Sequence, residues 1–392
     1  MKKLIALLLG VCMVLSMAAC GGNSTTATTA AATTEATTEA TTEAATEATQ
    51  SQEEIDQAAA DEVAALIDAI YVQTRNDETD AQCEAAKAAW DALTDAQKEL
   101  VEGEEASPEY FGRDTGDASL DDPRNADNIG DNELLVLSFG TSFNDSRRLN
   151  IGAIESDLEK AFPDYSVRRG FTANIVIDHI QNRDGVKIDD VDEAMNRAVD
   201  NNVKNLVIQP THLMNGLEYQ ELEDQVAQYA DAFDKIAIGK PLLTSEDDFK
   251  RVEQALVDWT SEYDDGETAI CFMGHGTEAE SNEVYQKMQD LLTADGHDNY
   301  FVGTVEASPS LEDVLAKVKA GSYKRVVLEP LMVVAGDHAN NDMAGEEEDS
   351  WKTTFEDAGY EVTCLLRGLG ENEAIRQIYV EHAQAAMDSL NQ

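Results

Sequence analysis

Residues 134–142 read LLVLSFGTS, and residues 269–277 read AICFMGHGT. Each segment is an apolar run that ends in a loop containing Gly and Thr. Uninterrupted apolar runs of this length are typical of strands buried on both faces, as in a parallel sheet that helices cover on two sides. Because the pattern occurs twice, the sequence predicts two similar α/β halves.

The similarity extends into the residues that follow each segment. VRRGFTAN at 167–174 is matched by VGTVEASP at 302–309. LVIQPTHLMNG at 206–216 is matched by VVLEPLMVVAGDH at 326–338, and each has Pro at the strand end and Gly six residues later. Amphipathic stretches with helical spacing separate most of the strand-like runs, which favours parallel sheets covered on both faces. The expected strands are residues 134–138, 166–169, 205–209, 235–238, 269–273, 300–305, 325–328 and 361–366.

The predicted fold is therefore α/β, with two flavodoxin- or Rossmann-like halves whose parallel sheets face a central cleft. We place the halves at residues 131–245 and 246–392. Open sheets of this kind bind ligands outside the carboxyl ends of their strands, so the expected site lies at those ends.

The first 20 residues have the pattern of a bacterial lipoprotein signal. Lys2 and Lys3 precede a short apolar run, and small residues lead to Cys20. The apolar run is short for a membrane span. We therefore expect cleavage before Cys20 and lipidation of this cysteine, which places the protein outside the cytoplasm on the bacterial cell membrane. An uncleaved membrane anchor is the alternative.

Three segments separate this signal from the α/β region. Residues 21–52 are rich in Thr, Ala and Glu and predict a solvated tether. Residues 53–105 have helical spacing and predict a small all-α module, a spacer or docking element with Thr94 and Gln97 as a capping box. Residues 106–130 are polar and predict a linker.

The composition excludes one class of partner. The chain has 78 acidic and 28 basic residues, a formal net charge of −50, which argues against nucleic acid as a ligand. The sequence also has no GxxxxGK phosphate loop, consistent with chemistry that does not use ATP.

Three residues point to a metal site. His275, Glu306 and His338 each lie just past a strand-like run of the second half. Two imidazoles and a carboxylate on successive loops provide three ligands for a divalent transition metal and leave one face open. Taken singly, each residue has a simpler interpretation, as a helix cap or a surface carboxylate. Asp337 is a candidate to orient one of the histidines through a hydrogen bond.

Seven runs of the α/β region carry a family resemblance: LLVLSFGTSFNDS, GFTANIVIDHIQNRDG, IQPTHLMNGLEY, FMGHGT, GTVEASP, LMVVAGDHANNDMAGEEEDSWK and RGLGENEAIR. By these runs, the region 134–391 resembles the anaerobic cobalt chelatase family, the class II sirohydrochlorin cobaltochelatases. By motif, the family's metal-binding residues fall on His275, Glu306 and His338. The resemblance implies insertion of a metal, most of all Co(II), into a sirohydrochlorin-type tetrapyrrole without ATP, with Ni(II), Fe(II) or Zn(II) in its place as alternatives.

The expected catalytic residues are His275 and His338, because a histidine that is not fully engaged with metal can accept a pyrrole proton near neutral pH. Residues 131–392 are accordingly the expected chelatase domain. An extracytoplasmic protein that binds metal or tetrapyrrole in the same cleft without turnover is the alternative function. The sequence also allows a homo-oligomer.

Arginines are the expected partners of the macrocycle's carboxylates. Five occur within 40 residues of an otherwise acidic region. Surface salt bridges are favoured for Arg147 and Arg148 and are the alternative for Arg169, which is expected at a strand end facing the cleft. His212, Phe139 and Ser138 complete the expected substrate-binding set, with a structural role as the alternative for His212. The five arginines are Arg147, Arg148, Arg168, Arg169 and Arg183.

Overall fold

A computed structural model describes residues 51–70, 75–76, 78–104, 106–108, 110–111 and 116–390. The expected signal peptide, Cys20 and all but the last two residues of the expected tether lie outside these ranges. Among the described residues, no helix is long and apolar enough to cross a membrane.

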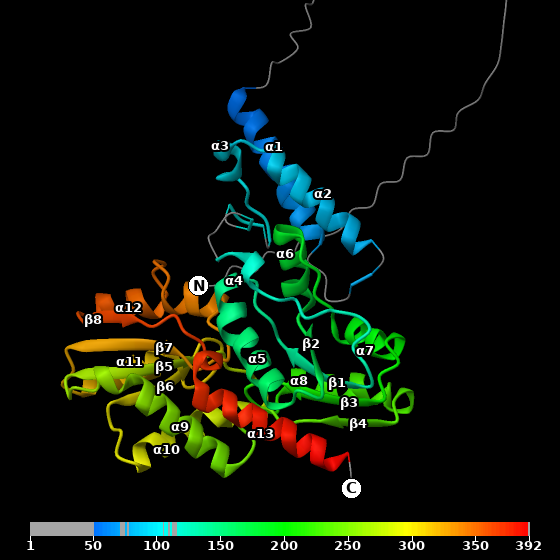
Figure 1. The fold of residues 1–392 in the computed structure, drawn as a ribbon. Coiled ribbons are helices and arrows are strands. Elements are labelled where there is room, and N and C mark those ends of the chain that lie inside the picture. The colour runs from blue at the N-terminus through cyan, green and yellow to red at the C-terminus, as the bar shows by residue number, and fades with distance from the viewer. Residues whose placement is uncertain are drawn as a thin grey trace, which may run out of the picture. The chain divides into compact units, whose positions relative to one another are not determined.

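The α/β region contains eight strands in two sheets (Figure 1). The strands are β1 (Asn132–Ser138), β2 (Ser166–Phe171), β3 (Asn205–Pro210), β4 (Lys235–Ile238), β5 (Thr268–Gly274), β6 (Tyr300–Thr304), β7 (Arg325–Pro330) and β8 (Glu361–Cys364). The first sheet has the order β2-β1-β3-β4 and the second β6-β5-β7-β8. All pairings are parallel. The two sheets have the same strand order when β5 to β8 are matched in turn to β1 to β4. The prediction of two similar α/β halves is confirmed.

Helices connect the strands. In the first half they are α4 (Asn144–Ser146), a π-helical turn (Arg147–Ile151), α5 (Gly152–Ala161), α6 (Asn174–Asp184), α7 (Val191–Asp200) and α8 (Leu217–Ala227). In the second half they are α9 (Glu246–Thr260), α10 (Glu283–Ala294), α11 (Leu311–Ala320), a π-helical turn (Ala339–Met343), α12 (Trp351–Asp357) and α13 (Glu373–Ser389). Capping boxes begin α7, α9 and α11, where the side chains of Asp190, Ser245 and Ser310 accept hydrogen bonds from the third residue of the helix.

The central strands explain why the opening segments are apolar throughout. Leu134 and Val136 of β1 belong to the same buried cluster as Ile270 and Phe272 of β5, so the two sheets share a core. Successive side chains of a strand point to opposite faces, and Leu135 accordingly belongs to a second cluster that α7 and α8 cover. Because both faces of each central strand are buried, neither strand has a polar alternation.

The last helix crosses between the halves. α13 follows the second sheet in sequence, yet it packs against α5, β3 and β4 of the first half and against α9. The Tyr379 hydroxyl donates a hydrogen bond to the carbonyl oxygen of Thr211 at 2.9 Å. Arg376 pairs with Asp157 of α5 at 2.5 Å. The two halves are therefore joined by packing as well as by the chain.

The N-terminal module is helical, as expected. Its helices are α1 (Gln52–Ala69), α2 (Thr79–Ala92) and α3 (Asp95–Lys98), and Thr94 and Gln97 form the expected capping box at the start of α3. The module has its own apolar core, in which Ile67 and Trp90 pack with Phe111. It is a folded unit that lies against α6 of the first half (Figure 1).

The expectation that Arg169 faces the cleft is wrong. Its side chain is completely buried, and Nη2 donates to Glu155 Oε2 of α5 at 2.7 Å while Nη1 donates to Asp121 Oδ2 at 2.6 Å. Arg147, expected at the surface, is also completely buried and pairs with Asp121 at 2.7 Å. Buried guanidinium groups require such partners, and these carboxylates meet that requirement. Arg148 is half exposed and pairs with Asp145, as expected of a surface arginine.

We predict that Arg169→Met destabilises the protein by about 3–5 kcal/mol, because Glu155 and Asp121 then lose a buried charged partner. The free energy of unfolding in urea, measured by circular dichroism, checks this. Arg148→Met is the matched control and should cost less than about 1 kcal/mol, since its ion pair is exposed. Equal losses for the two variants would contradict the structural role of Arg169.

Candidate metal centre and cavity

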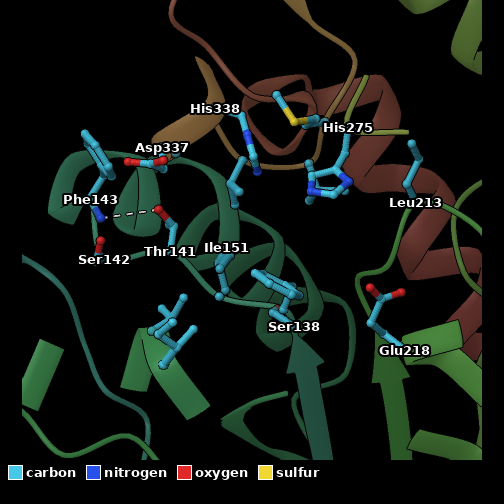
Figure 2. A pocket seen from close by; sticks show the side chains of 18 of the residues that line it. Ser138, Thr141, Ser142, Phe143, Ile151, Leu213, Glu218, His275, Asp337 and His338 are labelled. Atoms are coloured by element: carbon cyan, nitrogen blue, oxygen red, sulfur yellow. Dashed lines mark hydrogen bonds between the residues drawn. The ribbon is translucent and has the colours of Figure 1, made fainter. Parts of the chain in front are cut away.

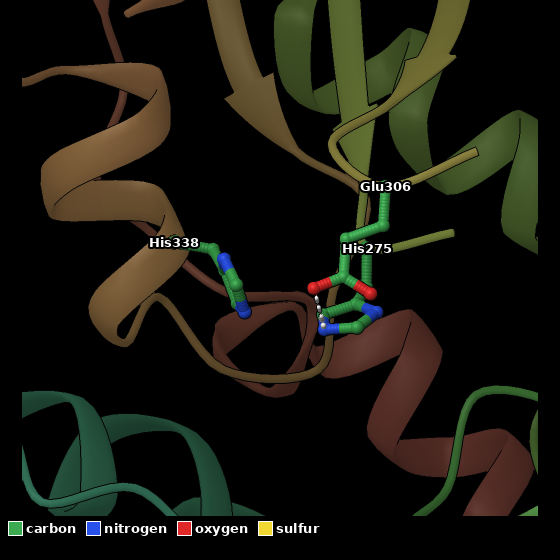
Figure 3. Close-up of side chains that lie close together, drawn as sticks. All are labelled: His275, Glu306 and His338. Atoms are coloured by element: carbon green, nitrogen blue, oxygen red, sulfur yellow. Dashed lines mark ion pairs between the residues drawn. The ribbon is translucent and has the colours of Figure 1, made fainter. Parts of the chain in front are cut away.

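Three loops bring His275, Glu306 and His338 together (Figure 3). They follow β5, β6 and β7, which are neighbours in one parallel sheet, so the loops leave the same edge. One potential ligand atom from each residue lies within 4.8 Å of the other two. His275 Nε2 is 3.8 Å from Glu306 Oε1, and the two imidazole rings are 4.6 Å apart at an angle of 84°. The residues singled out by their sequence positions therefore converge.

The backbone around His275 depends on glycine. Gly276 has φ +91°, and a Cβ at this position would lie 2.8 Å from the amide nitrogen of Ala307. A larger residue would thus strain the turn and push away the loop that carries Glu306. His275 Nδ1 donates a hydrogen bond to the carbonyl oxygen of Gly276 at 2.7 Å, which leaves Nε2 as the atom with a free lone pair.

An aspartate orients the second histidine. His338 Nδ1 is 2.8 Å from Asp342 Oδ2, a residue that the π-helical turn over Ala339–Met343 places beneath the ring. With Nδ1–H donated to this carboxylate, Nε2 points toward His275 and Glu306 (Figure 3). The sequence had suggested Asp337 for this role, but Asp337 accepts a hydrogen bond from Asn341 at 2.7 Å. The hydrogen bond that His338 donates to Asp342 raises the pKa of His338 above its usual value.

The three side chains remain accessible. The exposed fractions are 46% for His275, 56% for Glu306 and 34% for His338. Three such ligands hold a divalent transition metal and leave coordination positions for water or an incoming donor. Neutral imidazole and carboxylate together suit Co(II), Ni(II), Fe(II) or Zn(II), whereas Mg(II) prefers oxygen ligands.

The histidines open onto a cavity of about 580 Å³ (Figure 2). The first half lines it with the loop after β1, one face of α6 and the loop between β3 and α8. The second half lines it with the loops that carry His275 and His338. This volume is within the range of cavities that hold small organic ligands or cofactors. Two of the three potential metal ligands, His275 and His338, thus lie on one wall of a cavity that both halves form.

Three of the four residues expected to contact a substrate line this cavity. They are Ser138, Phe139 and His212, and Arg169 is the exception. Phe139 is 49% exposed, a high value for a large apolar side chain. Burial lowers the pKa of His212 to about 4, so its ring is neutral, and neither ring nitrogen has a hydrogen-bond partner among the described residues. Contact of these side chains with a substrate stays a prediction.

Sequence reasoning did not assign a site role to Arg183, which lines the cavity from α6. It is the only arginine or lysine among the described residues that line the cavity. Its guanidinium donates to the carbonyl oxygen of Ser142 at 2.6 Å and pairs with Asp184. Its place among the five clustered arginines pointed to a role in binding carboxylates. The sequence did not show, however, whether Arg183 or Arg169 faces the cavity. Glu218, at the start of α8, also lines the cavity and was missed (Figure 2).

Comparison with known proteins decides the family. Residues 132–388 match the family model of cobalt chelatase, CbiK. The chain belongs to the cobalt chelatase family. The matched range includes both sheets and the three potential metal ligands. The N-terminal module lies outside it.

Individual relatives agree with this assignment. The chain is 37% identical over 255 residues to the sirohydrochlorin cobaltochelatase of Salmonella typhimurium, covering 65% of this chain and 96% of the relative. It is 29% identical over 261 residues to the sirohydrochlorin cobaltochelatase CbiKC of Nitratidesulfovibrio vulgaris, covering 66% of this chain and 91% of the relative. The structure also aligns with the crystal structure of the sirohydrochlorin chelatase SirB from Bacillus subtilis subspecies spizizenii in complex with cobalt. This alignment has a TM-score of 0.47 at 12% identity and covers 67% of this chain and 98% of SirB. The names of the two sequence relatives thus agree with the match to the cobalt chelatase family model.

We predict that Asp342→Asn weakens Co(II) binding at pH 8 by about tenfold, because loss of a carboxylate behind a ligating histidine typically costs 10–100-fold in affinity. In the unsubstituted protein, affinity should fall as the pH drops through the raised pKa of His338, since the protonated ring cannot bind metal. In the variant this pKa is lower, so the fall should move to lower pH. Isothermal titration calorimetry over a pH series measures both effects.

Asp290→Asn is the matched control, since Asp290 is an exposed aspartate of α10 whose carboxylate accepts a hydrogen bond from Gln286. An unchanged affinity and pH profile in Asp342→Asn would show that Asp342 does not orient His338.

Proposed function

We propose that this protein inserts Co(II) into a sirohydrochlorin-type tetrapyrrole, without ATP, on the outer side of the cell membrane. The observation that carries the proposal is the convergence of His275, Glu306 and His338, with the two histidines on one wall of a cavity of about 580 Å³ that both halves form. Family membership and the names of the relatives from Salmonella typhimurium and Nitratidesulfovibrio vulgaris support cobalt and sirohydrochlorin as the substrates.

The donor set suits transfer of a metal better than its permanent retention. Three accessible side chains hold Co(II) and leave positions for the pyrrole nitrogens to enter as protein ligands leave. A structural site, in contrast, is closed by four protein ligands. Ni(II), Fe(II) and Zn(II) bind similar donors, so we expect them to compete for the same residues.

Insertion also requires proton transfer. As Co(II) enters the macrocycle, two pyrrole N–H bonds break and two protons must leave, which balances the charge of the metal. His338 is suited to accept one of them once the metal has left Nε2, because the hydrogen bond to Asp342 raises its pKa. His275, whose Nε2 also faces the site, is the second candidate acceptor.

The remaining cavity walls suit a flat, carboxylated macrocycle. Phe139, Leu213 and Met214 offer apolar surface, and the hydroxyls of Ser138 and Thr141 offer hydrogen bonds. Arg183 provides a guanidinium group for a peripheral carboxylate. Sirohydrochlorin combines these features, an extended planar ring and several carboxylates.

The proposed location rests on the N-terminal sequence. The basic residues, the short apolar run and the small residues before Cys20 are typical of an exported and lipidated protein. The Thr-, Ala- and Glu-rich residues that follow would separate the folded region from the membrane. The tetrapyrrole and the divalent metal are then partners outside the cytoplasm, with the membrane contacted through the lipid.

Turnover distinguishes the enzyme from a binding protein that uses the same cavity. We predict that the purified full chain, solubilised in detergent, converts many equivalents of sirohydrochlorin and Co(II) to the cobalt complex, as followed by its absorbance bands. Product limited to one equivalent would support capture without catalysis. His275→Ala should abolish turnover and weaken Co(II) binding by more than about 100-fold, since a direct ligand is lost. His297→Ala, outside the cavity lining, is the control and should behave as the unsubstituted protein.

We predict that Arg183→Gln raises the KM for sirohydrochlorin by about tenfold or more, since a hydrogen bond between charged groups contributes about 1.5–3 kcal/mol. Co(II) affinity should not change, because Arg183 is not among the three metal ligands. Steady-state kinetics with each substrate varied in turn separates the two effects. Arg251→Gln, which removes an exposed pair with Glu381, is the matched control. An unchanged KM would remove Arg183 from the substrate-binding set.

A further inference from the structure

Helix α6 has one face on the N-terminal module and another on the cavity. Asp178 and Gln181 contact the module, while Val176, His179 and Arg183 line the cavity. These positions alternate along the helix. Contacts that hold the module-facing side of α6 therefore also fix the side that lines the cavity. The N-terminal module therefore lies directly behind one wall of the proposed macrocycle site.

Polar contacts make the docking of the module specific. Arg75 forms an ion pair with Asp178 and donates to Gln181 Oε1 at 3.0 Å. The side chains of Arg75 and Asp178 are 9% and 2% exposed. Gln181 in turn donates to Asp80 Oδ1 of α2 at 2.6 Å, and Lys187 pairs with the same carboxylate. A buried ion pair in a hydrogen-bond network is costly unless its partners stay in place, so this arrangement favours a fixed module over a loose tether.

The segment that leaves the module reaches the cavity. The Tyr110 ring stacks on the His179 ring with centroids 4.2 Å apart and planes 5° apart. His179 Nε2 also donates a hydrogen bond to the Tyr110 carbonyl oxygen at 2.7 Å. Burial lowers the pKa of His179 to about 4, so the stacked ring is neutral. Phe111 continues the contact into the core of the module, where its ring lies 5.1 Å from that of Trp90.

Ser107 and Tyr110 are themselves among the residues that line the cavity. Both precede residue 132, where the match to the cobalt chelatase family begins. Part of the cavity wall is therefore built from sequence that the family match does not include. A spacer that only separates the chelatase region from the membrane has no need for such contacts.

We propose that Tyr110 binds the macrocycle, forming with His179 an aromatic wall of the tetrapyrrole site that the N-terminal module supplies. Its ligand is a planar, carboxylated tetrapyrrole, whose edge meets the aromatic pair while a carboxylate reaches Arg183 on the same helix. Arg75 acts as a positioning residue, since it holds the module on α6. This inference rests on the proposed function and adds a binding residue to it.

The test compares Tyr110→Ala with Tyr110→Phe in the detergent-solubilised full chain, with Co(II) and sirohydrochlorin as substrates. Loss of the ring should raise the KM for sirohydrochlorin by about two- to twelvefold, the range for a lost aromatic contact of roughly 0.5–1.5 kcal/mol. The kcat and the affinity for Co(II) should stay the same, because Tyr110 is not one of the three potential metal ligands. Tyr110→Phe keeps the ring and should keep the KM.

Glu62→Ala, an exposed substitution on α1, is the matched control on the module and should leave the KM unchanged. An unchanged KM in Tyr110→Ala would overturn the inference. So would an equal rise in Tyr110→Ala and Tyr110→Phe, or a rise accompanied by loss of Co(II) affinity, since either points to a general disturbance of the fold. If the unsubstituted protein neither binds nor metallates sirohydrochlorin, the proposed function itself fails, and this result is distinct from any effect of the variants.

Discussion

The apolar core shared by β1 and β5 is the constraint on which the rest of the structure depends. Leu134 and Val136 of the first sheet and Ile270 and Phe272 of the second are buried in one cluster, so neither sheet can shift without exposing the other. This packing fixes the separation of the two sets of loops at the carboxyl ends of the strands. The cavity between those loops therefore has a defined width before any ligand arrives, and little binding energy is needed to form it.

Because the two sheets are fixed in this way, the metal ligands need few further contacts to hold them in position. Each follows a strand of the second sheet, and the parallel register of β6, β5 and β7 delivers all three to one edge. The local turn at Gly276 and the hydrogen bond from His338 to Asp342 then orient the two imidazoles. Rigid strands thus set the distances, and short polar contacts set the direction of the lone pairs. The result is a site that is formed yet still open to a second ligand.

Features that follow from patterns of residues close together in the sequence could be predicted, whereas those that depend on contacts between distant residues could not. Buried central strands leave a continuous apolar run, and ligands at successive strand ends must converge in a parallel sheet, so the fold and the trio at His275, Glu306 and His338 could be foreseen. The position of Arg169 could not, because its direction depends on Glu155 and Asp121, which approach only in the folded protein. Asp342 was missed although it lies four residues after His338, the spacing of neighbours on a helix face, because the sequence offered Asp337 as an adjacent carboxylate.

The crossing of α13 bears on how the chain is made. This helix ends at Ser389, yet it covers α5, β3 and β4 of the first half. As the protein is synthesised from its N-terminus, the first half emerges complete in its strands but without this cover, and apolar surface at α5 and β3 stays in contact with water. Its core closes only after α13 has been added. Folding of the first half therefore waits for a helix that follows the whole second sheet in sequence, and a chain cut before α13 leaves α5, β3 and β4 uncovered.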